Sequence, residues 1–117
     1  MEIINSDDRP SIVVGITSQQ DPKNTIQPLF NGIEEEQIPV VIKPIDVDNI
    51  VSRAYQASLS SRLSVGIAFE NDRIVVHYKN LQESEPLFDK SSSDDVQLRK
   101  LGANAARLVK GIPFKKL

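Results

Sequence analysis

Residues 11–17 read Ser-Ile-Val-Val-Gly-Ile-Thr, a nearly unbroken apolar run close to the start of a 117-residue chain. Runs of this kind are typical of strands in parallel sheets, because helices bury such sheets on both faces. The segment Ile12-Val13-Val14-Gly15-Ile16 is therefore predicted to be a central strand of an α/β sheet.

A helix and a second strand are predicted to follow. After a polar loop containing Asp21-Pro22, four apolar residues recur at the spacing of one helix face, namely Ile26, Leu29, Phe30 and Ile33. Pro28 fits such a helix only in its first turn, so the helix is predicted to begin near Thr25. The second strand is Ile38-Pro39-Val40-Val41-Ile42, which Pro44 closes.

The middle of the chain predicts another helix and a hairpin. Asn49 can cap a helix that runs to about Ser60, because its side chain can accept a hydrogen bond from an exposed backbone N–H. Residues 63–69 and 73–78 are apolar, partly β-branched runs. The residues between them, Glu70-Asn71-Asp72, tolerate the left-handed backbone of a hairpin turn.

The last part predicts a short edge strand and a final helix. The edge strand is placed at Leu87-Phe88, and the helix begins at Ser92 or Ser93 and ends at Gly111. Two strand-helix-strand crossovers require parallel strands, whereas the hairpin reverses one strand. The expected fold is a three-layer α/β/α sandwich on a small mixed sheet of about five strands, one of them antiparallel.

Composition excludes several classes of function. Fourteen Lys and Arg against sixteen Asp and Glu give a net charge of -2, which does not attract nucleic acid or an anionic membrane. The absence of cysteine removes disulfides and thiolate metal sites. No apolar run reaches membrane-spanning length, and the start lacks the features of a signal peptide. We expect a flexible segment over residues 1–10 and a single cytoplasmic domain over residues 11–117.

Catalytic and nucleotide-binding signatures are missing. His77 is the only histidine; it could act as a base at a strand end, but a residue that is hydrogen-bonded or stacked on the surface is the simpler interpretation. The five glycines form no phosphate-binding loop, and the Asp-x-His-x-x-Gly pattern associated with cobalamin is absent. We therefore expect this chain alone to bind neither ATP nor cobalamin.

Two charge patterns stand out. Glu34, Glu35 and Glu36 end the first predicted helix, where they face the negative pole of its dipole. A solvated helix end would account for them, and so would a cation, either a partner's Lys or Arg or a metal such as Mg²⁺. After Val96 the chain carries only basic charges, which we interpret as favourable at a helix C-terminus and tail. Gly32 indicates that another element packs closely against the acidic turn.

Three stretches resemble the small subunit of the reactivating factor for coenzyme B12-dependent diol and glycerol dehydratases. They are Gly32-Ile33-Glu34-Glu35-Glu36, His77-Tyr78-Lys79-Asn80-Leu81 and Asn104-Ala105-Ala106-Arg107-Leu108-Val109-Lys110-Gly111-Ile112-Pro113-Phe114. The resemblance spans most of the chain and implies a fold like that of the dehydratase medium subunit. The sequence departs from the family pattern over residues 18–24 and at Gln37, where glycine is common.

The resemblance implies a chaperone-like role without catalysis. In that family the small subunit joins a large subunit with an Hsp70-like ATPase core, forming an α2β2 heterotetramer. By subunit swapping with the dehydratase, the factor releases damaged cobalamin so that intact coenzyme can enter. The resemblance does not indicate whether the dehydratase that is reactivated uses glycerol or 1,2-propanediol, the substrate of propanediol utilization. Association with a bacterial microcompartment is left open as well.

The resemblance also implies site residues. Glu35 matches the family's ligand to Mg²⁺ or another divalent cation between the two subunits, with the remaining protein ligands supplied by the large subunit. Further interface candidates are Gly32, Glu34, Glu36, His77 and Lys79.

Two alternative functions compete with this prediction. The first is the medium structural subunit of a B12-dependent dehydratase, although such subunits are longer. The second is a stand-alone domain that binds a small ligand or an anticodon, for which the polar strand end at residues 77–80 is the best support.

Overall fold

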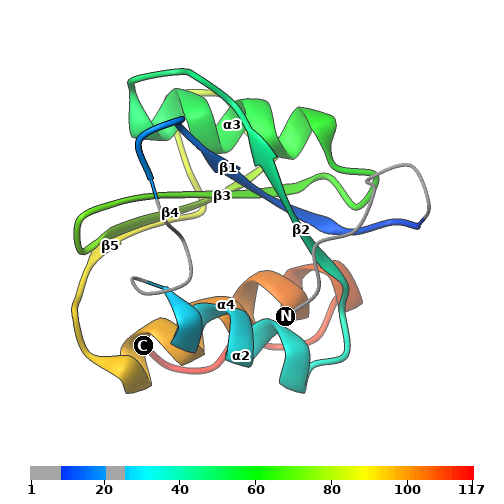
Figure 1. Cartoon of the computed structure of the whole chain (residues 1–117). Coiled ribbons are helices and arrows are strands. Elements are labelled where there is room, and N and C mark those ends of the chain that lie inside the picture. The colour runs from blue at the N-terminus through cyan, green and yellow to red at the C-terminus, as the bar shows by residue number, and fades with distance from the viewer. Residues whose placement is uncertain (1–8, 21–25) are drawn as a thin grey trace.

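The computed structural model describes residues 9–20 and 26–117 (Figure 1). Its elements in chain order are β1 (Ile12–Ile16), α2 (Gln27–Glu35), β2 (Val40–Pro44), α3 (Ile50–Ser60), β3 (Val65–Glu70), β4 (Arg73–Tyr78), β5 (Phe88–Ser91) and α4 (Asp95–Lys110). Most of the N-terminal segment predicted to be flexible, the loop at Asp21-Pro22 and the helix start near Thr25 lie outside the described residues.

The five strands form one mixed sheet in the order β2-β1-β3-β4-β5. β1 pairs in parallel with both β2 and β3, so the apolar run of residues 12–16 lies between two strands as predicted. β4 pairs antiparallel with β3 and with β5, and is thus the one reversed strand. The predicted mixed sheet is confirmed.

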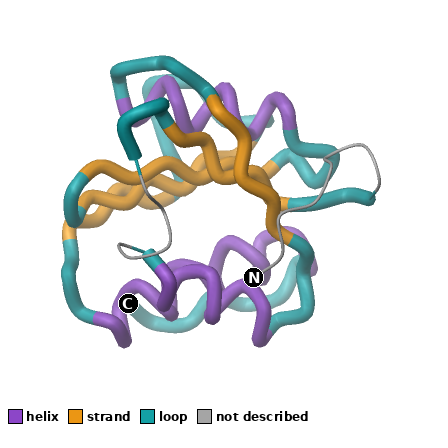
Figure 2. Tube along the Cα trace, in the orientation of Figure 1, coloured by secondary structure: helices purple, strands orange, loops and turns teal. Residues whose placement is uncertain are grey.

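Helices cover both faces of this sheet (Figures 1 and 2): α3 packs on one face, and α2 and α4 lie together on the other. The chain steps from β1 outward to β2 and then back across β1 to β3. Crossovers between parallel strands are right-handed as a rule, so two crossovers that step in opposite directions put α2 and α3 on opposite faces. The larger part of the core lies between the sheet and the α2–α4 layer, where Phe30, Ile33, Ile67 and Leu101 are fully buried.

The α3 layer approaches the sheet closely at a glycine. A Cβ atom on Gly66 of β3 would lie 2.1 Å from the backbone nitrogen of Ser58 and 2.4 Å from the carbonyl oxygen of Ala54. A side chain would push the helix away from the strand, so glycine sets the distance between these layers.

The ends of the elements follow local chemistry. The predicted cap of α3 is confirmed, because Asn49 Oδ1 accepts the Ser52 N–H at 3.0 Å. The prediction that Ser92 or Ser93 caps α4 is wrong: Asp94 is the cap and accepts the Val96 N–H at 2.9 Å. Ser92 instead accepts the Asp94 N–H at 3.1 Å, so the hydroxyl supports the turn that leads into the helix.

Gly111 ends α4 in the left-handed conformation, with φ 68°, as predicted. The predicted edge strand is longer than expected, since β5 runs from Phe88 to Ser91. Across the parts of the chain that the structure describes, no helix is both long and apolar enough to span a membrane.

Candidate functional site

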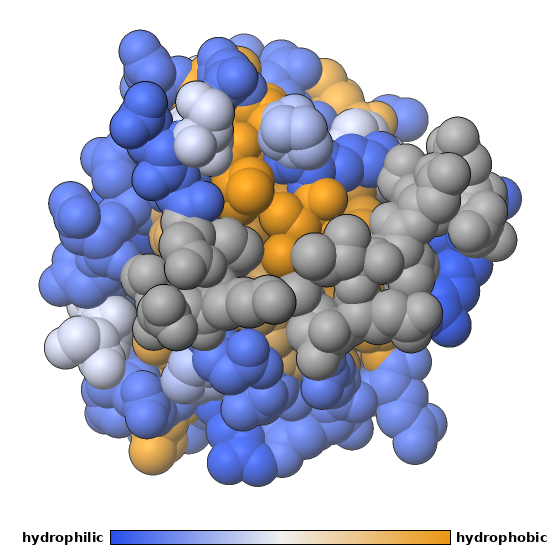
Figure 3. Space-filling view, in the orientation of Figure 1, coloured by the Kyte–Doolittle hydropathy of each residue, from blue (hydrophilic) through white to orange (hydrophobic). Residues whose placement is uncertain are grey.

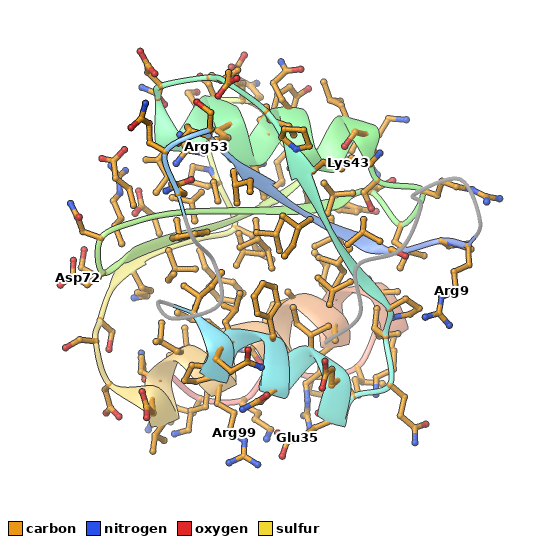
Figure 4. The ribbon with its side chains drawn as sticks, in the orientation of Figure 1. Arg9, Glu35, Lys43, Arg53, Asp72 and Arg99 are labelled. Carbon is orange, nitrogen blue, oxygen red and sulfur yellow. The ribbon has the colours of Figure 1, made fainter. Side chains whose placement is uncertain are left out.

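The acidic end of α2 packs against α4 (Figure 4). Glu34 and Glu35 are the last two residues of α2, and Glu36 is its C-cap. No basic residue lies in the last turn of α2 itself. The charge facing the helix dipole must therefore be balanced by another element.

Glu35 is balanced by Arg99 of α4. Arg99 Nε donates to Glu35 Oε1 at 2.8 Å, and Arg99 Nη2 donates to Glu35 Oε2, so the guanidinium binds both carboxylate oxygens. Both side chains remain about half exposed, at 56% for Arg99 and 43% for Glu35. The hydrogen bond from Arg99 lowers the pKa of Glu35, which keeps the carboxylate ionised.

Glu36 is balanced by the last turn of α4 and is much less exposed, at 11%. Lys110 Nζ donates to Glu36 Oε1 at 2.6 Å and to the Glu36 carbonyl at 3.2 Å, and Arg107 Nε donates to Oε2 at 3.2 Å. Its pKa is lowered, chiefly by the bond from Lys110 and further by Arg107. The basic residues near the end of α4 thus stabilise the C-termini of two helices.

The sequence left two explanations open for the acidic run, a solvated helix end or a cation from a partner or a metal. In this structure the balancing cations are Arg99, Arg107 and Lys110 of the same chain. The basic residues were interpreted only as charges for their own helix and tail, and their pairing with α2 was missed. The residues of these ion pairs are separated by 64 and 74 positions in the sequence. The packing of α2 on α4 brings them together, and local sequence patterns do not indicate that packing.

Gly32 lies where α2 crosses α4. A Cβ atom on Gly32 would be 2.0 Å from the Arg99 carbonyl oxygen, and one on Gly102 would be 2.0 Å from the Leu29 carbonyl oxygen. The close packing predicted from Gly32 is confirmed, and the element packed against it is α4. Gly32 is buried by this contact, so in this structure its surface is covered by its own chain.

His77 is hydrogen-bonded, as the simpler interpretation expected, but it is buried, so its predicted place on the surface is wrong. Tyr78 N–H donates to Nδ1 at 2.9 Å, which leaves the proton on Nε2 to be donated to the Glu83 carbonyl at 2.9 Å. The ring also contacts Tyr55 of α3, with centroids 5.0 Å apart. His77 therefore lies on the α3 face of the sheet, opposite Glu35.

The direction of β4 also argues against a ligand site at His77. β4 is antiparallel, so its C-terminal end lies at the edge where the parallel strands begin. Ligand sites in open α/β sheets form at the other edge. Lys79, just beyond β4, is exposed, and its role at an interface stays a prediction.

Arg53 was not predicted and is the largest fully buried side chain. Its guanidinium donates to the carbonyl oxygens of Val47 at 2.7 Å and Phe69 at 2.8 Å. It thereby ties the loop after β2 to the end of β3. Burial lowers its pKa, and nearby Glu70 and Asp48 oppose that shift.

The acidic end of α2 is suited to give one ligand to a metal. Within residues 9–20 and 26–117 no group of three or more His, Asp or Glu side chains could hold an ion alone. Glu35 does present an exposed carboxylate, the ligand type that Mg²⁺ prefers. This fits an ion whose other ligands come from a second chain, with Arg99 giving up at least one carboxylate oxygen.

Residues 9–115 match the dehydratase medium subunit family. The propanediol dehydratase-reactivating factor small subunit of Salmonella typhimurium is 46% identical over 109 residues, which cover 92% of this chain and 92% of that protein. The diol dehydratase-reactivating factor small subunit of Klebsiella michiganensis is 52% identical over 87 residues, which cover 74% of this chain and 70% of that protein.

Solved structures of dehydratase-reactivating proteins also resemble this chain. A structure of diol dehydratase-reactivating factor complexed with ADP and Mg²⁺ contains a chain that is 42% identical and superposes with a TM-score of 0.85, covering 93% of this chain and 100% of that one. A glycerol dehydratase reactivase chain is 30% identical with a TM-score of 0.84, covering 92% of this chain and 98% of that one.

Proposed function

The chain belongs to the dehydratase medium subunit family and, within it, to the small subunits of dehydratase-reactivating factors; on this premise we propose that it acts as a non-catalytic subunit in dehydratase reactivation. It joins a large ATPase subunit in an α2β2 heterotetramer. The chain itself binds neither ATP nor cobalamin and contributes shape and contact surface.

One observation carries this proposal: residues 9–115 match the dehydratase medium subunit family, while relatives with 46% and 42% identity are reactivating-factor proteins. Two proteins of one fold can compete for the same binding surface on a third. We propose that the chain exchanges with the dehydratase medium subunit. The resulting steric conflict opens the dehydratase and lets damaged cobalamin leave.

Glu35 is the proposed contact to a divalent cation at the interface with the large subunit. Support comes from its exposure at the end of α2 and from the Mg²⁺ in the related reactivating factor. Glu34 and Lys79 are exposed and remain candidates for the same interface. Glu36 contributes by holding the helix end against α4.

The test is a reactivation assay on a B12-dependent diol dehydratase inactivated by glycerol. The chain is co-expressed with its large subunit, and activity is followed after adding ATP, Mg²⁺ and fresh coenzyme. We expect recovery that needs both subunits and ATP. The large subunit alone is the control, and recovery without this chain, or none with it, would contradict the proposal. A stable complex of this chain with cobalamin and dehydratase large subunits would instead support a medium-subunit role.

A further inference from the structure

A basic groove lies beside the Glu35–Arg99 pair, between α2 and α4. It encloses about 320 Å³ and is lined by Arg99, Lys100 and Lys115, with Asp95 as the one acidic side chain. Figure 3 shows a mainly hydrophilic surface over these helices, with a hydrophobic spot where α4 begins. Val96, which also lines the groove, is 60% exposed and is the most exposed of the large apolar side chains described.

Arg99 belongs to both features, since it lines the groove and binds both oxygens of Glu35. A metal ion or a partner's ammonium group that approaches Glu35 needs at least one of these oxygens. Arg99 stays positively charged at any physiological pH, so it is repelled by the arriving cation. Binding at Glu35 therefore displaces Arg99, in whole or in part.

The groove determines where the displaced guanidinium is stable. Lys100 and Lys115 line it as well, so an Arg99 released from Glu35 leaves three cations together with only Asp95 to balance them. A carboxylate from outside the chain would remove this repulsion. Bidentate binding by a guanidinium is the strongest form of such a contact.

We propose that Arg99 is a second anchor for the large subunit, exchanging Glu35 for a carboxylate on an acidic segment of that subunit that lies in this groove. Val96 supplies an apolar contact for the same segment. This inference rests on the proposed function, because it needs a large subunit that offers a cation to Glu35. Each ion pair broken within the chain is then replaced by one across the interface.

The experiment is a double-mutant cycle on binding to the purified large subunit with ADP and Mg²⁺. Dissociation constants are measured for the wild type, Glu35→Gln, Arg99→Ala and the double variant. Arg73→Ala is the matched control, because Arg73 binds both oxygens of Asp89 at 2.9 and 2.7 Å and is 40% exposed, but lies on the β4–β5 hairpin.

We expect Arg99→Ala to weaken binding about tenfold, because Arg anchors often dominate interfaces. Its Mg²⁺ dependence should remain, since Glu35 is intact, and its salt dependence should be smaller. The double variant should bind more weakly than Glu35→Gln alone. Lys100→Ala should also lose affinity for the large subunit, but less than Arg99→Ala. Arg73→Ala should bind like the wild type.

Three results would overturn the second anchor while leaving the proposed function intact. Unchanged or tighter binding of Arg99→Ala means that Arg99 only competes for Glu35. A double variant equal to Glu35→Gln means that Arg99 acts only by positioning that carboxylate. If Arg99→Ala and Arg73→Ala lose the same affinity, the effect comes from the overall charge of the chain and not from the groove. A wild type that does not bind the large subunit overturns both this inference and the proposed function.

Discussion

The side-chain amide of Asn104 makes both backbone hydrogen bonds of Lys115. Asn104 Nδ2 donates to the Lys115 carbonyl at 3.0 Å, and the Lys115 N–H donates to Asn104 Oδ1 at 2.6 Å. Asn104 is fully buried in α4, so this pairing fixes the C-terminal tail along the helix. Arg107 adds a second attachment by donating to the Pro113 carbonyl at 3.0 Å.

Asn104→Ala should therefore destabilise the fold by about 1–3 kcal/mol, since two hydrogen bonds are lost at a buried site. The free energy of unfolding in urea measures this loss. The matched control is Asn80→Ala, because Asn80 is exposed and its amide donates to the hydroxyl of the nearby Tyr78 at 3.1 Å. We expect the control to change stability by less than about 0.5 kcal/mol. Equal losses in both variants would argue against the tail attachment.

Gly32→Ala should destabilise the chain although alanine favours helices by about 1 kcal/mol over glycine. The added methyl would lie 2.0 Å from the Arg99 carbonyl, so α2 and α4 must separate. We expect a net loss of about 2 kcal/mol or more, from overpacking against backbone. Gly15→Ala is the control, because the three atoms nearest to its Cβ would be side-chain atoms, the first at 3.1 Å, and not backbone. A Gly32→Ala variant as stable as Gly15→Ala would show that the helix crossing adapts easily.

Local patterns predicted the elements well because the signals lie within the elements. Periodicity placed the helices and strands, and Asn49 and Gly111 marked helix ends by their own chemistry. The missed features depend on contacts between distant elements. Arg53 lies inside the helix that was predicted to run from Asn49 to about Ser60, yet its burial follows from carbonyls brought together by β3 and the loop after β2. Asn104 did carry a signal, as a polar residue within an apolar stripe.

Gln37→Gly should stabilise the chain. Gln37 adopts a left-handed backbone with φ 63° just after the cap of α2, and its N–H donates to the Glu34 carbonyl at 2.9 Å. A side chain in this conformation costs about 1–2 kcal/mol, offset in part by the greater freedom of glycine in the unfolded chain. These two effects together should raise the free energy of unfolding, measured in urea, by about 0.5–1 kcal/mol. Gln37→Ala serves as the control and should not gain stability, because it keeps the Cβ atom.

Acid should weaken the contact between α2 and α4 through Glu36. Lys110 and Arg107 hold the folded-state pKa of Glu36 below its ordinary value of 4.5. The stabilisation is therefore complete above that value and is lost as the pH falls through it toward the folded-state pKa. The free energy of unfolding in urea, measured from about pH 7 to pH 3, should fall more steeply for the wild type than for Glu36→Gln.

The comparison variant for this titration is Asp89→Asn. Asp89 also has a lowered pKa, because of its bond to Arg73, but its ordinary value is 3.8. The loss of its contribution should thus begin at a lower pH than the loss for Glu36. Parallel curves for the wild type and Glu36→Gln would mean that the ion pairs at the end of α2 contribute nothing measurable to stability.

Glu35→Gln should separate the binding role of the acidic run from its structural role. Glu35 is half exposed, whereas Glu36 is largely buried, so the isolated Glu35→Gln chain should unfold like the wild type while Glu36→Gln should be less stable. Binding to the large subunit should weaken for Glu35→Gln, and adding Mg²⁺ should no longer strengthen it. Titrations with Mg²⁺ and with EDTA measure this difference, and Asp89→Asn is the control for losing an exposed, paired carboxylate. If Glu35→Gln kept the Mg²⁺ dependence of the wild type, the divalent cation would have to bind elsewhere, since amide oxygens replace carboxylates poorly as Mg²⁺ ligands.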